Sequence, residues 1–418
     1  MPKTPANRFL FERKLVFVLL CSAFILAFFH RVAPTVIAEE LTESLGASSL
    51  ALGSIAAMYF YIYALMQVPA GIIVDRVGPR LSVGLATALG GVGSILFGLA
   101  PDVLVANIAR CIIGFGVAFA FVGAMRASAV WFRAEHYAMA GGWIILVGNL
   151  GAVLGTTPLA WTLAWVSWRT TFVAMGVIAL VLAIAILRFV RDRPSNTEFD
   201  QGGETPSAAQ FKHDLVACLK QPGVWLCFLA GFALVGTFFG FTGIWAVPYL
   251  QERAGFTKQQ AADCLTFALI LLAIGAPLAG WASDRMRRRK PLIIAACVAS
   301  GATWLALGAF DGLGFWTLSL LLACSGLCCG PIVGAYATAK DLAPPSAAGF
   351  AVALVNTGLF AGAAILQLVI GWILTHLPAE THYFYALLCL TGVALLGGIA
   401  ALFIPETHPS RSGPQAQN

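Results

Sequence analysis

Long apolar runs alternate with short polar segments along this chain, and the pattern predicts membrane-spanning helices. A helix needs about 20 apolar residues to cross the hydrocarbon core of a bilayer. Lipid offers no hydrogen-bond partner to an unsatisfied backbone group, so the runs must be helices or the strands of a closed barrel. Barrel strands would show alternation of period two, and this alternation is absent, so the runs are expected to be helices. There are twelve of them: 15–38, 48–73, 81–100, 104–128, 140–163, 170–190, 223–250, 261–283, 291–310, 314–337, 347–376 and 383–404.

The composition is not that of an ordinary soluble protein. Hydrophobic residues make up 59% of the chain, charged residues only 11%, and the mean hydropathy is +0.86. A soluble domain carries about 25% charged residues, so most of this surface is expected to face membrane lipids. The net charge of +6 therefore does not indicate a nucleic-acid partner. The ten cysteines include no Cys-x-x-Cys pair with accompanying histidines, so we predict no metal site and no cofactor.

One short charged turn occurs twice, over residues 71–80 and 280–290. Asp75 and Asp284 lie 209 residues apart, half the length of the 418-residue chain. A repeat at that period predicts two similar halves. The expected organisation is an all-α membrane protein with twelve transmembrane helices in two pseudo-symmetric six-helix bundles: an N-terminal bundle over 1–190, a linker over 191–222, a C-terminal bundle over 223–404 and a tail over 405–418. A short amphipathic helix is expected in the linker, around 207–219.

The basic residues predict the orientation of the helices, because Lys and Arg accumulate in cytoplasmic loops. With the N-terminus inside, nineteen of the twenty-five Lys and Arg residues fall in inside segments. Three fall outside, namely Arg169, Arg253 and Lys258, and three fall within spans. We therefore expect both termini and the linker to be cytoplasmic.

Six helices, a polar linker, six more helices and the repeated turn resemble the major facilitator superfamily of secondary transporters. Gly71-x-x-x-Asp75-Arg76-x-Gly78-x-Arg80 is similar to the family's loop 2–3 signature. The second copy, which contains Asp284 and Arg285, looks like its degenerate counterpart in loop 8–9. Arg110-x-x-x-Gly114-x-Gly116 resembles the fourth-helix signature. The resemblance covers nearly the whole chain.

In that family the charged turn holds the two halves in one state, so the resemblance implies a gating motif. An anchor for membrane topology is the alternative role. We expect Gly71 to allow close approach of a neighbour, Gly78 to adopt positive φ, and Asp75 to accept hydrogen bonds at a helix N-terminus. The expected gating residues are Gly71, Asp75, Arg76, Gly78, Arg80, Asp284 and Arg285.

A narrower resemblance is to the organic-anion and organophosphate branch, the anion:cation symporters. It rests on the segments 28–31, 63–71 and 167–172. In that branch an arginine of helix 1, matched here by Arg31, binds the anionic group of the substrate. Proton-coupled members often carry Asp where this chain has His30, and Glu in helix 4 where it has 116–118. These departures argue against proton coupling through the usual carboxylates.

The charged residues inside the predicted spans are candidate functional residues, because each costs roughly 2.5–3.5 kcal/mol to insert at the bilayer centre. All nineteen acidic residues lie at span ends or in loops, so a bound anion is the expected partner of Arg31, whose guanidinium fork suits a carboxylate or phosphate. The alternative is hydrogen bonding to helix-end carbonyls or to a backbone kinked at Pro34. Arg110 either shapes the site or couples motion, as its match to the fourth-helix signature implies, or extends to the outer interface. His30 either carries a coupling proton or stays neutral as a hydrogen-bonding group.

Polar and aromatic side chains within the spans complete the candidate substrate site. Amides inside a span seek a partner, either a substrate or a neighbouring helix, and aromatic side chains either line a cavity or pack. The expected substrate-binding residues are Arg31, His30, Arg110, Tyr59, Tyr63, Gln67, Trp245 and Asn356.

We predict a monomeric secondary active transporter in the cytoplasmic (inner) membrane of a bacterium. It is expected to move a small organic anion, which is a carboxylate, an amino acid or a phosphorylated compound, by alternating access. Ion-coupled symport, with a proton as the candidate ion, is what the resemblance implies. The alternatives are a proton-driven multidrug or siderophore exporter and a transport-inactive sensor. An enzyme is not expected, because no nucleophile–base pair, metal set or phosphate-binding loop is present in the sequence.

Overall fold

The computed structural model describes residues 5–132, 134–193, 208–344 and 347–407, and these residues form helices and no strands. Contacts between Cα atoms divide the chain into two compact units. The first unit comprises Met1–Gly46 and Tyr61–Glu204, and the second comprises Ala47–Phe60 and Thr205–Asn418. The all-helical fold predicted from hydropathy is thus confirmed, whereas the predicted domain limits stay predictions.

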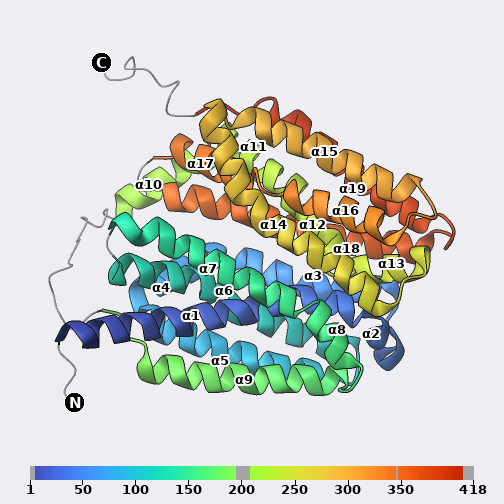
Figure 1. Cartoon of the computed structure of the whole chain (residues 1–418). Coiled ribbons are helices and arrows are strands. Elements are labelled where there is room, and N and C mark those ends of the chain that lie inside the picture. Colours follow the sequence, from blue (N-terminus) through green and yellow to red (C-terminus); the bar gives the residue numbers. More distant parts are fainter. Residues whose placement is uncertain (1–4, 133, 194–207, 345–346, 408–418) are drawn as a thin grey trace. The chain divides into compact units, whose positions relative to one another are not determined.

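The first unit is a bundle built around α5 and α1 (Figure 1). α5 packs lengthwise against α6 and α9, while α1 packs against α7 and α6. The helices that lie in this unit, together with the last residues of α3, are α1 (Pro5–Val36), α2 (Ala38–Leu45), α4 (Gln67–Val77), α5 (Pro79–Gly98), α6 (Val103–Trp131), α7 (Ala134–Leu154), α8 (Thr157–Leu163) and α9 (Trp168–Phe189).

In the second unit α15 packs against α19, as α5 packs against α9 in the first, and α14 packs against α16. Its α10 is the short helix that the sequence predicts in the linker, around 207–219. The helices of this unit, besides most of α3 (Ser49–Leu65), are α10 (Ala208–Leu219), α11 (Pro222–Gly231), the π-helix η1 (Phe232–Gly236), α12 (Thr237–Thr242), α13 (Ala246–Ala254), α14 (Lys258–Met286), α15 (Lys290–Ala309), α16 (Phe315–Leu327), α17 (Ile332–Leu342), α18 (Ala348–His376) and α19 (His382–Ala401).

Among the described residues, eleven helical segments are long and apolar enough to cross a membrane. The number is twelve if two helices that are joined at a sharp bend count together as one span. The bent pair is α2 with α3, whose axes differ by 118°. The predicted span 48–73 is two helices, α3 and α4, which are separated at Met66. The sequence prediction of a twelve-helix membrane protein therefore agrees with the structure in the number and nature of the helices, but not in the continuity of each span.

Several predicted spans are interrupted where glycine or proline lets the backbone depart from α geometry. The seventh span changes to π geometry at η1 and is interrupted again by the turn at 243–245. The tenth is interrupted at 328–331, a turn that contains Gly330 and Pro331. A hydropathy average over a window does not register such breaks, because the interrupting residues are themselves apolar or small.

Glycines bring α7 into direct contact with α1. A Cβ atom added at Gly151 would lie 2.1 Å from the carbonyl oxygen of Ile25, and one at Gly148 would lie 2.5 Å from the ring of Phe24. Atoms cannot approach that closely, so these two positions require glycine if the helix spacing is to be kept. Gly142, on the same helix, has no atom within 4 Å of such a Cβ.

Each of the two charged turns contains one residue with positive φ. Gly78, which precedes α5, has a φ of +88°, and a Cβ there would lie 2.6 Å from the carboxylate of Asp192. The prediction of positive φ at Gly78 is confirmed. At the corresponding position of the second turn, Arg287 ends α14 with a φ of 52°, and it is the sole non-glycine residue with positive φ in the described structure.

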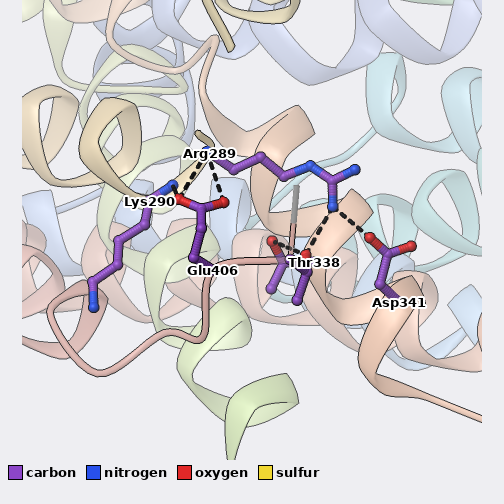
Figure 2. A network of polar contacts seen from close by, with 6 residues as sticks. Arg289, Lys290, Thr338, Asp341 and Glu406 are labelled. Carbon is purple, nitrogen blue, oxygen red and sulfur yellow. Dashed lines mark hydrogen bonds and ion pairs between the residues drawn. The ribbon is translucent and has the colours of Figure 1, made fainter. Parts of the chain in front are cut away.

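A carboxylate from the end of the same unit caps the helix that follows each turn. In the first unit Asp192 Oδ1 accepts a hydrogen bond of 2.8 Å from the backbone N–H of Arg80. In the second, the carboxylate of Glu406 accepts hydrogen bonds from the backbone N–H groups of Arg289 and Lys290 (Figure 2). The N-terminal end of a helix favours an anion, because its first N–H groups have no partner within the helix.

We predict that Gly151→Ala destabilises the protein, because the added methyl group forces α7 away from α1. Overpacking of this kind costs about 1–3 kcal/mol, which a thermal unfolding midpoint of the purified protein reports as a loss of several degrees. The matched control is Gly142→Ala, which has room for the methyl group and is expected to be neutral or stabilising by up to about 1 kcal/mol. Equal midpoints for the two variants would contradict the close contact.

We further predict that removing the glycine of the first turn lowers the stability of the protein, whereas introducing a glycine into the second turn raises it. Gly78→Ala places a side chain in a backbone region restricted to glycine and against Asp192, and should cost about 1–3 kcal/mol. Arg287→Gly should raise stability by up to about 1 kcal/mol, because glycine adopts positive φ without strain. Arg287→Ala removes the same charge but keeps a Cβ, so a midpoint for Arg287→Gly no higher than for Arg287→Ala would refute the argument.

Candidate functional site

Arg31 lies in the core of the first unit, and its side chain is packed between two aromatic rings. The residue is only 4% exposed. Its guanidinium carbon lies 4.1 Å from the ring centroid of Phe28, on the same helix, and 5.4 Å from that of Tyr63. A cation over an aromatic face is stabilised by the ring quadrupole, by about 2 kcal/mol or more when water is excluded. The two rings thus help to hold the cationic group in a defined orientation.

His30 and Arg110 lie beside Arg31 in the same core. Arg110, on α6, is fully buried and donates a hydrogen bond of 2.8 Å from Nη1 to the backbone carbonyl of His30. His30 is 2% exposed, and its ring lies 5.7 Å from that of Phe172. Nδ1 of His30 is buried and has no hydrogen-bond partner within the described structure. The structure therefore brings together three of the predicted substrate-binding residues around one stretch of α1.

Two further predicted residues flank the break between α3 and α4. Gln67 is buried and donates a hydrogen bond of 3.1 Å from Nε2 to the backbone carbonyl of Tyr63. Tyr63 in turn faces the guanidinium of Arg31. Tyr59, although on the same helix as Tyr63, belongs to the second unit, where it is fully buried next to Phe60.

The predicted residues of the second unit are engaged with neighbouring helices. Trp245 is 1% exposed and donates a hydrogen bond of 3.2 Å from Nε1 to the backbone carbonyl of Gln367. Asn356, on α18, accepts a hydrogen bond of 2.8 Å from the hydroxyl of Tyr336 on α17. Gln367 itself bonds the carbonyl of Phe239 at 3.1 Å. Sequence reasoning missed Gln367, although an amide within a span is the signal that singled out Gln67 and Asn356.

The first charged turn carries an ion pair and a small cavity. Asp75 lies in the last turn of α4 and pairs with Arg126 of α6 at 3.1 Å. Side chains that include these two, with Arg76, Gly78 and Asp192, line a cavity of about 170 Å³. The expectation that Asp75 accepts hydrogen bonds at a helix N-terminus is wrong, because Asp192 occupies that place at α5.

Other members of the predicted gating motif lie at the surface. Arg76 and Arg80 are exposed, and Nε of Arg80 donates a hydrogen bond to the carbonyl of Leu187 at 2.7 Å. A Cβ at Gly71 would meet no atom within 4 Å, so close approach does not explain this glycine. In the second unit Asp284 and Arg285 are exposed. Asp284 lines a cavity of about 160 Å³ together with Arg289 and Pro331.

The buried charges of the described residues are predominantly positive. Arg31 and Arg110 are both buried, whereas Asp214 of α10 is the sole buried carboxylate in the described part of the chain. No group of three or more His, Cys, Asp or Glu side chains that could hold a metal ion is present among the described residues. The core of the first unit thus encloses two arginine side chains.

Comparison with known proteins agrees with this architecture. The sequence matches the Major Facilitator Superfamily over residues 19–262 and 242–418. The structure is similar to the nucleoside transporter NupG, with a TM-score of 0.76 at 12% identity, over 93% of this chain and 99% of that one. At that identity the likeness concerns the fold alone.

Three curated relatives align along nearly the whole chain. The "Probable sulfoacetate transporter SauU" of Cupriavidus necator is 24% identical, over 94% of each chain. The D-galactonate transporter of Escherichia coli O6:H1 is 24% identical, over 94% of this chain and 95% of the relative. The membrane sensor protein UhpC of Salmonella typhimurium is 23% identical, over 95% and 92% respectively. The chain therefore belongs to the Major Facilitator Superfamily of multi-pass membrane transporters and is not an enzyme.

Proposed function

We propose that this protein is a secondary transporter that moves a small organic anion across the bacterial cytoplasmic membrane by alternating access. The single observation that carries the proposal is the buried guanidinium of Arg31, held between the rings of Phe28 and Tyr63. A guanidinium presents paired N–H donors that match a carboxylate, sulfonate or phosphate group. The names of the sulfoacetate and galactonate transporters support the same ligand chemistry.

Ion-coupled symport is the transport mode that we propose. A proton is the candidate coupling ion, and His30, which is buried next to Arg31 in the core of the first unit, is its candidate carrier. The protein is expected to act as a monomer. The distribution of its Lys and Arg residues supports an orientation with both termini in the cytoplasm.

Two other functions make different demands on the site. An exporter of cationic compounds usually exploits buried carboxylates, and Asp214 of α10 is the one buried carboxylate among the described residues. A sensor that binds an anion without moving it is the second candidate, because UhpC is as similar to this chain as the transporters are. Flux of a bound anion into proteoliposomes separates the proposed anion transporter from the sensor: a transporter accumulates the anion, whereas a sensor binds it without flux.

We predict that Arg31→Gln weakens anion binding strongly while leaving the protein folded. Hydrogen bonds to a charged group contribute about 1.5–3 kcal/mol, so affinity should fall roughly tenfold to a hundredfold. Arg31→Lys keeps the charge but loses the fork and should retain an intermediate affinity. The measurement is a thermal-shift titration with sulfoacetate, D-galactonate, amino acids and hexose phosphates, followed by flux in proteoliposomes.

The matched control for this prediction is Arg188→Gln. Arg188 also lies over a phenylalanine ring, that of Phe189, at 5.6 Å, but it is exposed at the end of α9. Its removal should leave binding and flux unchanged. Without ligand, Arg31→Gln should unfold within a few degrees of the wild type, because removal of a buried charge offsets the loss of the contacts with Phe28 and Tyr63. A lower midpoint together with unchanged affinity would make Arg31 a structural residue and overturn the proposal.

We predict that Asp75→Asn slows transport without weakening binding. The pair with Arg126 is partly exposed, with side-chain exposures of 67% for Asp75 and 43% for Arg126. Such pairs stabilise a protein by only about 0.2–1 kcal/mol, so the unfolding midpoint should hardly change. Initial rates of uptake and the dissociation constant, measured on the same preparation, test this. The charge-swapped double variant Asp75→Arg/Arg126→Asp should regain part of the rate, and a swap as slow as Asp75→Asn would show that the pairing itself does not matter.

A further inference from the structure

Pro34 leaves one backbone carbonyl of α1 without its normal partner. In an α-helix the N–H of residue i bonds the carbonyl of residue i−4, and the residue four before Pro34 is His30. Proline has no N–H, and its ring also clashes with that carbonyl. α1 nevertheless continues past Pro34 to Val36, and Pro34 itself is buried.

Arg110 supplies the missing donor from another helix. Its Nη1 lies 2.8 Å from the carbonyl oxygen of His30, and both residues are almost inaccessible to solvent, with exposures of 0% and 2%. A buried carbonyl without a donor is destabilising, and lipid cannot provide one. The guanidinium of Arg110 therefore takes the place of the N–H that Pro34 lacks.

The bonded carbonyl belongs to the peptide group that joins His30 to Arg31. From this geometry we propose that Arg110 is a positioning residue for Arg31. By bonding the His30 carbonyl, Arg110 fixes the peptide plane from which the Arg31 side chain extends toward Phe28 and Tyr63. Proline makes this arrangement necessary, because a residue with an N–H at position 34 would satisfy the carbonyl from within α1. The inference rests on the proposed function only in that Arg31 is taken as the anion-binding group.

The hydrogen-bond part of the inference is tested by a double-mutant cycle that requires no ligand. The four proteins are the wild type, Pro34→Ala, Arg110→Met and the double variant, compared by thermal unfolding of the full-length protein. Arg110→Met should lower the midpoint by several degrees, because methionine fills similar space but donates no hydrogen bond. In the Pro34→Ala background the loss should be much smaller, because the new N–H at position 34 bonds the His30 carbonyl. An equal loss in both backgrounds would overturn the inference.

Pro277 provides a matched control, since it also lies inside a long helix, α14. Pro277→Ala should not reduce the loss caused by Arg110→Met, and a reduction equal to that of Pro34→Ala would overturn the inference. If Arg110→Met does not fold, the cycle is run with Arg110→Lys, which keeps a positive charge but has a single donor group. Its loss should likewise shrink in the Pro34→Ala background, and an undiminished loss would count against the inference.

The positioning part is tested by the dissociation constants for sulfoacetate and D-galactonate. Arg110→Met should weaken the binding of whichever probe the wild type binds by about tenfold or more, and the double variant should bind within about threefold of Pro34→Ala. If Arg110 contacts the anion itself, the double variant stays as weak as Arg110→Met. If Arg110 is merely structural, Arg110→Met lowers the midpoint and leaves affinity unchanged. Either result overturns the positioning role, whereas a wild type that binds neither probe counts against the proposed function and leaves the unfolding cycle valid.

Discussion

The hydrocarbon interior of a membrane offers no hydrogen-bond partner, and this constraint explains most of what the structure shows. Regular helices satisfy their own backbone, so the informative places are those where the helix does not. At Pro34 the carbonyl of His30, which lacks its usual N–H donor, is bonded by Arg110. At the interrupted seventh span the carbonyl of Phe239 accepts the backbone N–H of Gly243 and, in addition, the side-chain amide of Gln367. In both places a long polar side chain from another helix bonds the backbone near the irregularity and so ties two helices together.

The same requirement is met at the helix ends by carboxylates that are distant in sequence. Asp192 follows α9 and caps α5, and Glu406 follows α19 and caps α15. The two units thus repeat one arrangement of the backbone although their residues differ. Each turn also contains one residue with positive φ, Gly78 in the first and Arg287 in the second, although only Arg287 has the left-handed helical conformation. The repeat thus extends to the capping of the following helix, but not to the detailed conformation of the turn.

The buried arginines and the partly exposed ion pair of the charged turn differ in how strongly their interactions stabilise the protein. Arg31 and Arg110 are enclosed, where an interaction with a charged group is worth several times that of an exposed ion pair. The pair of Asp75 with Arg126 is partly exposed and contributes about 0.2–1 kcal/mol. A contact that breaks and re-forms in every transport cycle must be weak, whereas a residue that selects a ligand benefits from exclusion of water. The proposed roles follow this difference.

Hydropathy alone determined that the chain is an all-helical membrane protein with twelve helical spans, and the spacing of its charged turns indicated two similar halves. It also identified Arg31, because a charged residue within an apolar run is conspicuous in any window. Only the tertiary structure decided which groups those residues meet. That Asp192 rather than Asp75 caps a helix, that Arg126 pairs with Asp75, and that the carbonyl exposed by Pro34 belongs with Arg110 all depend on contacts between segments 50 to 120 residues apart. Hydropathy is a property of neighbouring residues, whereas hydrogen-bond partners are set by how helices pack, which is why the spans could be predicted and the partners could not.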